Sequence, residues 1–362
     1  MSVFHVVSCS GGKDSDATLD LALRRFPKSR VIAIFCDTGN EHALVYSHLE
    51  YLESRHGITI VRLMADFAED IARKRMYIAR DVRTRREYDR VPRLDASGRP
   101  VYRRTNAGEV ELREVKRDGK TVLEPVPRMK KAGGRRVRWS NKAKRRALET
   151  LHPSGNPFLD LCMLKGRFPS RKAQFCTQEL KTMMAVAFQL ELVEQGHRVV
   201  SWQGVRRDES LNRAKAKLFE RIAPRLYAYR PLVEWSAVQV FAHLAAHDVQ
   251  PNELYRLGMS RVGCMPCINV NKGELREIAA RWPEEIDRIA EWEARVGRCS
   301  KHGYSTFMTD AHPAKDRRVI FAELMNIRAR VEWSKTSRGG KQIDLFADAP
   351  PAACSSAYGL CE

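Results

Sequence analysis

The stretch Ser10-Gly11-Gly12-Lys13-Asp14-Ser15 joins an apolar run at residues 4–9 to an amphipathic run at residues 17–25. A strand that ends in a glycine-rich turn and continues into a helix presents backbone N–H groups to anions, and the helix dipole favours negative charge there. Lys13 adds a positive charge, and the Ser15 hydroxyl can donate to a phosphate oxygen or cap the helix. The spacing differs from the P-loop pattern G-x-x-x-x-G-K-[ST]. The sequence therefore predicts a nucleotide site at residues 10–15.

Apolar runs and helical patterns alternate on both sides of this turn. Residues 31–36 and 58–63 are predicted strands, separated by a predicted helix at residues 41–55. Asp37 follows the second strand, at the edge of a parallel sheet where ligands bind. The alternation resumes later, with predicted helices at 177–195, 237–246 and 274–296 and predicted strands at 197–204 and 227–233. These features predict an α/β fold with a doubly wound parallel sheet.

The chain divides into five predicted segments. Residues 71–150 hold 26 Lys and Arg against 10 Asp and Glu, which is a surplus of 16 out of a net charge of +20 for the whole chain. Such a concentration of positive charge favours binding to nucleic acid, although a solvated surface facing a protein partner is the alternative. The segments are 1–81 and 151–260, two halves of a nucleotide-binding domain; 82–150, a basic insertion with a hairpin near 101–122; 261–335, a C-x-x-C and helical region; and 336–362, a flexible tail bearing cysteines.

The composition restricts the cellular setting. No apolar run approaches the roughly 20 residues of a membrane helix, and the N-terminus lacks the pattern of a secretory leader. We therefore expect a cytoplasmic protein that makes no membrane contact. The chain has nine cysteines, and in a reducing compartment these indicate metal or redox chemistry rather than disulfides. The ten histidines show no spacing that predicts a metal site.

The clearest cysteine feature is Cys264-Met265-Pro266-Cys267, because a C-x-x-C turn directs two sulfurs toward one metal ion or cluster. Cys162 and Cys176 lie upstream, while Cys9 and Cys36 fall in predicted buried strands. Spacing alone does not separate a zinc site from an iron–sulfur cluster.

Together these motifs resemble the PP-loop ATP pyrophosphatase superfamily, and specifically its branch similar to phosphoadenosine phosphosulfate (PAPS) reductases and DNA-phosphorothioation sulfurtransferases. The resemblance covers about residues 4–270 without the basic insertion. Residues 10–15 are similar to its S-G-G-x-D-S loop, and Cys176-Thr177 with Leu180-Lys181 is similar to its C-T-x-x-L-K element. A third match to the family, its G-x-R-x-x-E-S-x-x-R element, is Gly204-x-Arg206-x-x-Glu209-Ser210-x-x-Arg213. The segment before its cysteine pair is similar to Asn252-x-Leu254-Tyr255-x-x-Gly258-x-x-Arg261-x-Gly263-Cys264.

The resemblance implies a 4Fe–4S cluster held by Cys176, Cys264 and Cys267. Cys162 is the predicted fourth ligand, with Cys299 and an open iron position as alternatives. The resemblance also implies nucleotide contacts and Mg²⁺ at the glycine-rich loop. The predicted nucleotide-binding residues are Ser10, Gly11, Gly12, Lys13, Asp14, Ser15, Asp37, Gly204 and Arg213, and the predicted catalytic residues are Lys13, Asp14, Lys181, Arg206 and Cys361.

Two chemistries fit such a scaffold. In the first, ATP is cleaved to AMP and pyrophosphate to adenylate nucleic acid, which is then sulfurated with sulfur from a cysteine desulfurase or another donor. In the second, Cys361 or Cys354 of the tail attacks PAPS or APS and releases sulfite, or these two thiols are incidental. The intact loop and the basic insertion favour the first, and the cysteine tail favours the second. A nucleic-acid-binding regulator that senses nucleotide is a further hypothesis.

Overall fold

The computed structural model describes residues 2–82, 85–117, 120–137, 139–210, 213–308 and 325–336. It contains two compact units. The main unit comprises Met1–Met76 and Ala143–Glu362, and the hairpin unit comprises Tyr77–Lys142. The hairpin unit overlaps the predicted basic insertion, whereas residues 143–150 cluster with the main unit.

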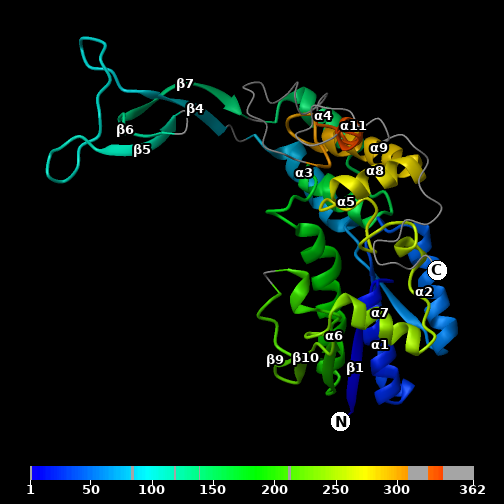
Figure 1. Ribbon diagram of the computed structural model, residues 1–362. Helices are drawn as coiled ribbons and strands as arrows, with labels where there is room; N and C mark the ends of the chain where they lie inside the picture. The colour runs from blue at the N-terminus through cyan, green and yellow to red at the C-terminus, as the bar shows by residue number, and fades with distance from the viewer. Residues whose placement is uncertain are drawn as a thin grey trace. The chain divides into compact units, whose positions relative to one another are not determined.

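The main unit is built on a six-stranded sheet in the order β3-β2-β1-β8-β10-β9 (Figure 1). All neighbouring pairs are parallel except β10 and the edge strand β9, which run antiparallel. This arrangement confirms the predicted α/β class, although the sequence did not predict β9. The strands are β1 (Val3–Cys9), β2 (Val31–Asp37), β3 (Ile60–Met64), β8 (Arg198–Trp202), β9 (Phe219–Ala223) and β10 (Leu226–Tyr229).

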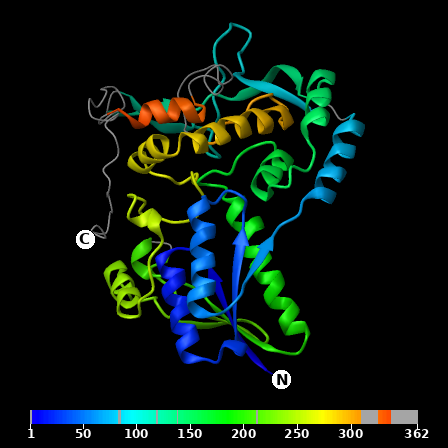
Figure 2. The ribbon, with the colours of Figure 1, turned by 90° about the vertical axis from the view of Figure 1, so that its right-hand side faces the viewer.

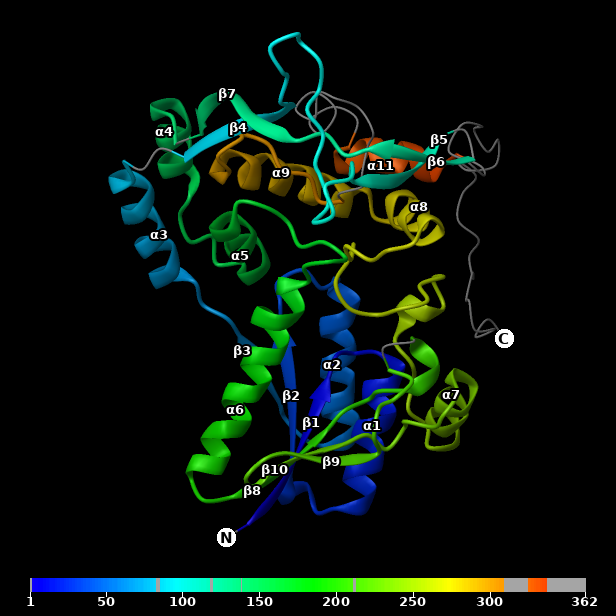
Figure 3. The same cartoon turned by 90° about the vertical axis from the view of Figure 1, so that its left-hand side faces the viewer.

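Helices cover both faces of this sheet. α1 (Lys13–Arg25) and α2 (Ala43–His56) pack on one face and α6 (Met183–Glu194) on the other (Figures 2 and 3). The hydrophobic core forms where α6 meets the strands: Val6, Ile34, Val199 and Leu226 are buried against α6 side chains that include Phe188 and Leu192. Complete burial of one such side chain contributes about 1.5–3 kcal/mol.

The order of the strands reverses beside β1. The chain passes from β1 to β2 on one side, whereas β8 pairs with β1 on the other side. In parallel sheets this reversal leaves a crevice at the carboxyl ends of the two strands, where ligands bind. The glycine-rich loop follows β1 and Gly204 follows β8, so both lie at this crevice.

A second group of helices packs together in the main unit: α5 (Pro157–Lys165), α8 (Lys272–Arg281), α9 (Pro283–Cys299) and α11 (Ile327–Ser334). Phe158 of α5 stacks on Trp292 of α9 at 5.7 Å between ring centroids. The single helix predicted over residues 274–296 was wrong, because Trp282 precedes Pro283 and a residue before proline is disfavoured in helical geometry. In the part of the chain that the structure describes, no helix combines the length and apolar character of a membrane span.

Three further α-helices lie in the described part of the chain: α3 (Ala68–Arg80), α4 (Asn141–Thr150) and α7 (Ala237–Ala246). Ser236 caps α7 as predicted, since its side chain accepts the Gln239 N–H. The predicted helix at 177–195 starts differently: a π-helical turn at Thr177–Thr182 precedes α6. This turn carries Lys181. π-helical turns occur frequently at functional sites.

The hairpin unit contains two antiparallel strand pairs. β4 (Arg85–Pro92) pairs with β7 (Met129–Val137), and β5 (Leu112–Arg117) pairs with β6 (Lys120–Pro125), which is later in the chain than the hairpin predicted near residues 101–122. Its basic side chains are solvent-exposed at Arg90, Arg93, Arg99, Arg103, Arg104, Arg113, Lys116, Arg117, Lys120, Arg128, Lys130 and Lys131.

Candidate nucleotide and cysteine site

The Ser15 hydroxyl holds the glycine-rich loop in shape. Its Oγ accepts the N–H groups of Ser10 at 3.1 Å and Gly12 at 3.2 Å and donates to the Gly12 carbonyl oxygen at 2.7 Å. Gly11 has φ +70°, a conformation that favours glycine. Of the two roles predicted for Ser15, the structure shows the capping contact with the Gly12 backbone at the start of α1.

Lys13 is fixed beside the loop by residues distant in sequence. Its backbone N–H donates to Tyr255 Oη at 3.0 Å, and its Nζ lies 3.3 Å from Asp14 Oδ2. The ammonium group also lies over the rings of Tyr255 and Phe241, at 5.4 and 5.9 Å from their centroids. Cation–π contacts of this kind orient the charge without neutralising it.

A buried ion pair connects the loop after β1 to the loop after β8. Arg206 Nε donates to Asp14 Oδ1 at 2.6 Å, and Arg206 Nη1 donates to Asp208 Oδ1 at 2.6 Å. Burial alone would lower the pKa of Arg206, yet the carboxylates of Asp14 and Asp208 raise it above its ordinary value. Arg206, predicted as catalytic, is therefore placed to position the loop.

Gly204 allows these two loops to approach each other closely. A Cβ atom at position 204 would lie 2.7 Å from the Asp14 carbonyl oxygen and 3.1 Å from the Ser15 nitrogen. Both neighbours are backbone atoms at the start of α1, so the loop itself would have to move.

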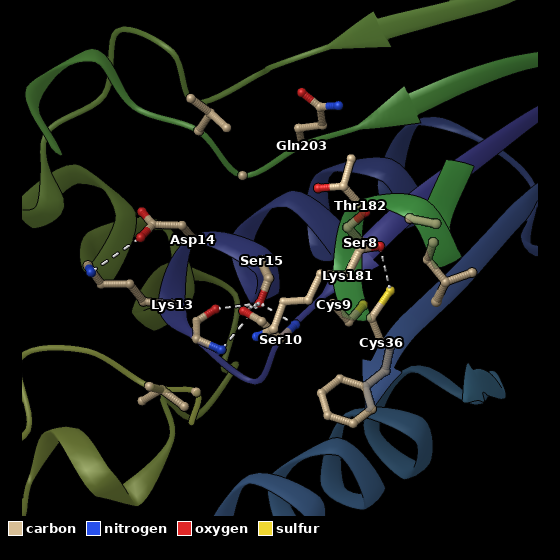
Figure 4. Close-up of a pocket in the computed structure, with 18 of the residues that line it drawn as sticks. Ser8, Cys9, Ser10, Lys13, Asp14, Ser15, Cys36, Lys181, Thr182 and Gln203 are labelled. Carbon is tan, nitrogen blue, oxygen red and sulfur yellow. Dashed lines mark hydrogen bonds and ion pairs between the residues drawn. The ribbon is translucent and has the colours of Figure 1, made fainter. Parts of the chain in front are cut away.

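The crevice contains a cavity of about 430 Å³ between the loop and α6 (Figure 4). Residues of the glycine-rich loop form one wall, Gln203 and Gly204 form another, and Lys181 and Thr182 close a third. Cys36 also lies in this wall, and its thiol donates to the Lys181 carbonyl oxygen at 3.5 Å. The mixture of backbone amides, cations and apolar side chains suits a nucleotide, whose phosphates and base need different surroundings.

A second cavity, of about 400 Å³, adjoins the first and contains three of the four predicted cluster ligands: Cys176, Cys264 and Cys267. Cys264 and Cys267 come from the turn after Gly263, and Cys176 directly precedes the π-helical turn. The two cavities share six lining residues: Ser10, Lys181, Arg213, Arg261, Val262 and Gly263.

Lys181 and Glu41 lie where the two cavities meet. Lys181 Nζ is 3.7 Å from Glu41 Oε1, and the Cys264 thiol is 3.7 Å from the same oxygen. Thr38 Oγ1 donates to both Glu41 oxygens at 2.8 Å and contacts Cys264 Sγ at 3.6 Å. The Cys264 thiolate, when it forms, and the Glu41 carboxylate raise the pKa of Lys181, so Lys181 carries a positive charge into both cavities.

The thiols of this second cavity are withdrawn from water. Burial raises the pKa of Cys264 to about 12, with Lys181 opposing the shift, and burial also raises the pKa of Cys176. A thiol of this kind is protonated at neutral pH, and a metal or cluster releases that proton on binding.

The two candidates for a fourth ligand differ in their surroundings. Burial raises the pKa of Cys162, and Cys176 is the charged neighbour that adds to the shift. Burial also raises the pKa of Cys299, to about 12, but its charged neighbours are Arg295, Arg298 and Arg146. Neither Cys162 nor Cys299 is among the residues that line the second cavity.

Some predicted site residues lie elsewhere. Asp37, predicted to contact nucleotide, is absent from the residues that line either cavity. Its Oδ1 instead accepts the Gly39 N–H at 2.8 Å and the Tyr46 hydroxyl at 2.9 Å, because a carboxylate directly after a strand readily closes a tight turn. Cys354 and Cys361 lie outside the described residues.

Sequence reasoning did not assign a role to Glu41, which lines the first cavity, or to Arg261, which lines both. Arg261 was visible within the motif before the cysteine pair. Sequence reasoning also missed a group of side chains that includes Asp20 of α1: ligand atoms of Asp20, His243 and His247 lie within 4.8 Å of one another. His243 lies on α7 and His247 is its C-cap, and their i, i+4 spacing could have revealed the group.

Comparison with known proteins gives a consistent result. Residues 4–270 match the phosphoadenosine phosphosulfate reductase domain family. An uncharacterized 37.8 kDa protein in the gpa 5′ region of Escherichia phage 186 is 41% identical over 372 residues, covering 100% of this chain and 97% of its own.

Enzymes match over shorter stretches. The adenosine 5′-phosphosulfate reductase of Neisseria meningitidis serogroup B is 34% identical over 101 residues, which is 27% of this chain and 38% of that enzyme. The chain therefore matches well under half the length of that reductase. The crystal structure of PAPS reductase from Candida auris overlaps 73% of this chain and 81% of its own, with 14% identity and a TM-score of 0.34.

Proposed function

Because the chain belongs to the phosphoadenosine phosphosulfate reductase domain family, we propose that it is a nucleotide-dependent sulfur enzyme that cleaves ATP to AMP and pyrophosphate and sulfurates nucleic acid. The observation that carries this proposal is the intact glycine-rich loop, which opens into a cavity adjoining a three-cysteine cavity. A loop with Lys13 and several amides suits a departing pyrophosphate.

The proposed first step is attack by a nucleic-acid oxygen on the α-phosphorus of ATP. The bond from this phosphorus to the β-phosphate bridging oxygen breaks, and pyrophosphate leaves with the electron pair. The loop amides and Lys13 would stabilise its charge, and Mg²⁺ would neutralise part of it when bound. In the second step, sulfur at the oxidation level of hydrosulfide attacks the nucleic-acid atom that bears the adenylated oxygen. The bond from this atom to the oxygen breaks, and AMP leaves with the oxygen and the electron pair. A cysteine desulfurase acting with a thiol reductant, or another donor, would supply that sulfur.

The cysteine cavity supports a 4Fe–4S cluster held by Cys176, Cys264 and Cys267, with Cys162 as the fourth ligand. Cys176, Cys264 and Cys267 line one cavity of about 400 Å³. Thiolates are the ligands of iron–sulfur clusters, and such a cluster would carry or activate sulfur when bound.

Similarity to adenosine 5′-phosphosulfate reductases supports a second candidate function, reduction of PAPS or APS. In that reaction a cysteine thiolate, for which Cys361 and Cys354 are the candidates, attacks the sulfate sulfur and displaces the nucleotide. A second thiol then releases sulfite and forms a disulfide, so the two thiols supply the two electrons.

Anaerobic incubation with ATP or PAPS, followed by chromatography of the products, tests these proposals. We expect AMP and pyrophosphate from ATP, formed faster when DNA or RNA is added. PAP and sulfite from PAPS, without cleavage of ATP, would overturn the ATP-dependent proposal in favour of the reductase. Nucleotide binding with neither set of products would contradict both and leave a nucleotide-sensing regulator.

We further propose that the hairpin unit binds the nucleic-acid substrate, because its exposed strands carry a dense array of cations. Exchange of Arg103, Arg113, Lys116 and Arg128 for glutamine should weaken binding to DNA or RNA by well over about tenfold near physiological salt. It should also reduce the slope of log affinity against log salt by about 3.6, since each of the four lost phosphate contacts contributes about 0.9. Fluorescence anisotropy at several salt concentrations measures both quantities.

The matched control for this variant is Leu123→Ala, which removes an exposed apolar side chain from β6 and should leave the salt dependence unchanged. ATP affinity should be the same in all three proteins. If the four-glutamine variant binds DNA and RNA as tightly as the wild type at every salt concentration, the hairpin unit is not the nucleic-acid surface.

A further inference from the structure

Asp20, His243 and His247 form a compact group between α1 and α7. His243 Nε2 lies 2.9 Å from Asp20 Oδ2, and the rings of His243 and His247 meet edge to face at 4.4 Å between centroids. Asp20 is 3% exposed and the two histidines are half-buried, so few waters compete for these atoms. The group belongs to neither cavity of the nucleotide and cysteine site.

The geometry of this group matches that of a mononuclear metal site. Two ligand atoms about 2.1 Å from a tetrahedral zinc ion lie about 3.4 Å apart. The three atoms here lie within 4.8 Å of one another, and the tightest pair is at 2.9 Å, so small side-chain rotations would equalise the separations. Among the described residues, this is the group of three His, Cys, Asp or Glu side chains whose ligand atoms all lie within 4.8 Å of one another.

We propose that Asp20, His243 and His247 bind a divalent transition-metal ion, best matched by Zn²⁺, which fastens α7 to α1. Two imidazoles and one carboxylate leave at least one position for water, as in zinc sites with three protein ligands. Imidazole and carboxylate donors select zinc, nickel or copper over magnesium and calcium, which prefer oxygen ligands.

The surrounding residues support the ligand role. Arg24 Nε donates to Asp20 Oδ2 at 2.7 Å, a bond that orients the carboxylate in the way outer partners of metal ligands do. The Arg24 charge would reduce affinity for a cation, so we expect moderate rather than very tight binding.

The metal would act on the nucleotide site through α1. This helix begins at Lys13, within the phosphate loop, and carries Asp20 two turns later. α7 packs against it and supplies Phe241, whose ring lies 5.9 Å from the Lys13 ammonium group. A metal that joins the two helices would therefore fix the position of the Phe241 ring relative to the Lys13 ammonium group (Figure 3 shows α7 beside α1).

Zinc stoichiometry and cobalt absorption of the full chain test this assignment. The probes are Zn²⁺ and Co²⁺ added to metal-depleted protein, compared between wild type, His243→Gln/His247→Gln and the control His302→Gln, an exposed histidine elsewhere. Cobalt on cysteine gives intense thiolate charge-transfer bands, whereas cobalt on His and Asp gives weak d–d bands without them. The absorption therefore separates this site from the cysteine cavity, and the outcome does not depend on any catalytic activity.

We expect the wild type and the control to bind one more equivalent of zinc than the double variant, and the extra cobalt equivalent to lack thiolate bands. The single variant His247→Gln, at the half-exposed end of α7, should keep the fold and weaken this binding more than about tenfold. Equal stoichiometry in wild type and double variant would overturn the proposal. So would an unchanged zinc affinity in a folded His247→Gln protein.

Discussion

Serine in place of Cys264 is expected to abolish incorporation of the iron–sulfur cluster. The Cys264 thiol lies in the 400 Å³ cavity with Cys176 and Cys267, and Lys181 is the cation that would offset the charge of its thiolate. A serine hydroxyl is a poor ligand for iron that prefers sulfur. Anaerobically purified wild type should contain about four iron and four sulfide per chain, and the variant almost none, as measured by iron and sulfide analysis and visible absorption.

A matched pair of variants identifies the fourth ligand. Cys162→Ser should also lose the iron, because Cys162 is the proposed fourth ligand, whereas Cys299→Ser should keep it. Both thiols are buried, so the two substitutions carry a similar structural cost. Loss of iron in Cys299→Ser alone would transfer the assignment to Cys299. Stoichiometric zinc and no iron in anaerobic wild type would contradict the cluster itself.

Alanine in place of Gly204 is expected to weaken nucleotide binding about 30-fold or more, equivalent to ~2 kcal/mol, while the protein remains folded. The added Cβ would lie 2.7 Å from the Asp14 carbonyl oxygen, so the start of α1 and the loop amides would have to move. Calorimetric titration with ATP and with PAPS measures the loss for whichever nucleotide binds. Nucleotide affinity should fall more than the stability of the fold, since nucleotide binding depends on the exact positions of a few N–H groups in the loop.

The matched control for this substitution is Gly273→Ala, near the start of α8. A Cβ there would meet only Asn271 Oδ1, at an ordinary 3.5 Å, and Gly273 lines neither cavity. Its nucleotide affinity should equal that of the wild type. Wild-type affinity in Gly204→Ala would mean that the loop after β8 does not constrain the phosphate site.

The features that the sequence predicted correctly are those encoded locally. The apolar run of β1, the glycine-rich loop and the polar start of α1 are consecutive, so their order alone indicates a strand, an anion-binding turn and a helix. The strand β2 and the cap of α7 at Ser236 are equally local. β9 was missed because edge strands lack the continuous apolar pattern of buried parallel strands.

The missing parts of the site depend on contacts between distant segments. Glu41 contacts the Cys264 thiol because its backbone pairs with Cys264, more than two hundred residues later in the chain. Asp37 was predicted to contact nucleotide, yet its carboxylate closes a turn on Gly39 and Tyr46, a contact that the sequence does not reveal. Asp20 meets His243 through the packing of α1 on α7, which neither helix reveals by itself.

The strand order also affects the order in which parts of the protein can fold during synthesis. β1 occupies the middle of the sheet, yet its partner β8 lies about 195 residues later, as in the pairing of Val3 with Arg198. During translation one edge of β1 stays unpaired until the ribosome has made the hairpin unit and the segment through α6. The hairpin unit pairs its own strands over short separations and can form first. The nascent chain thus acquires its basic surface before its nucleotide crevice exists.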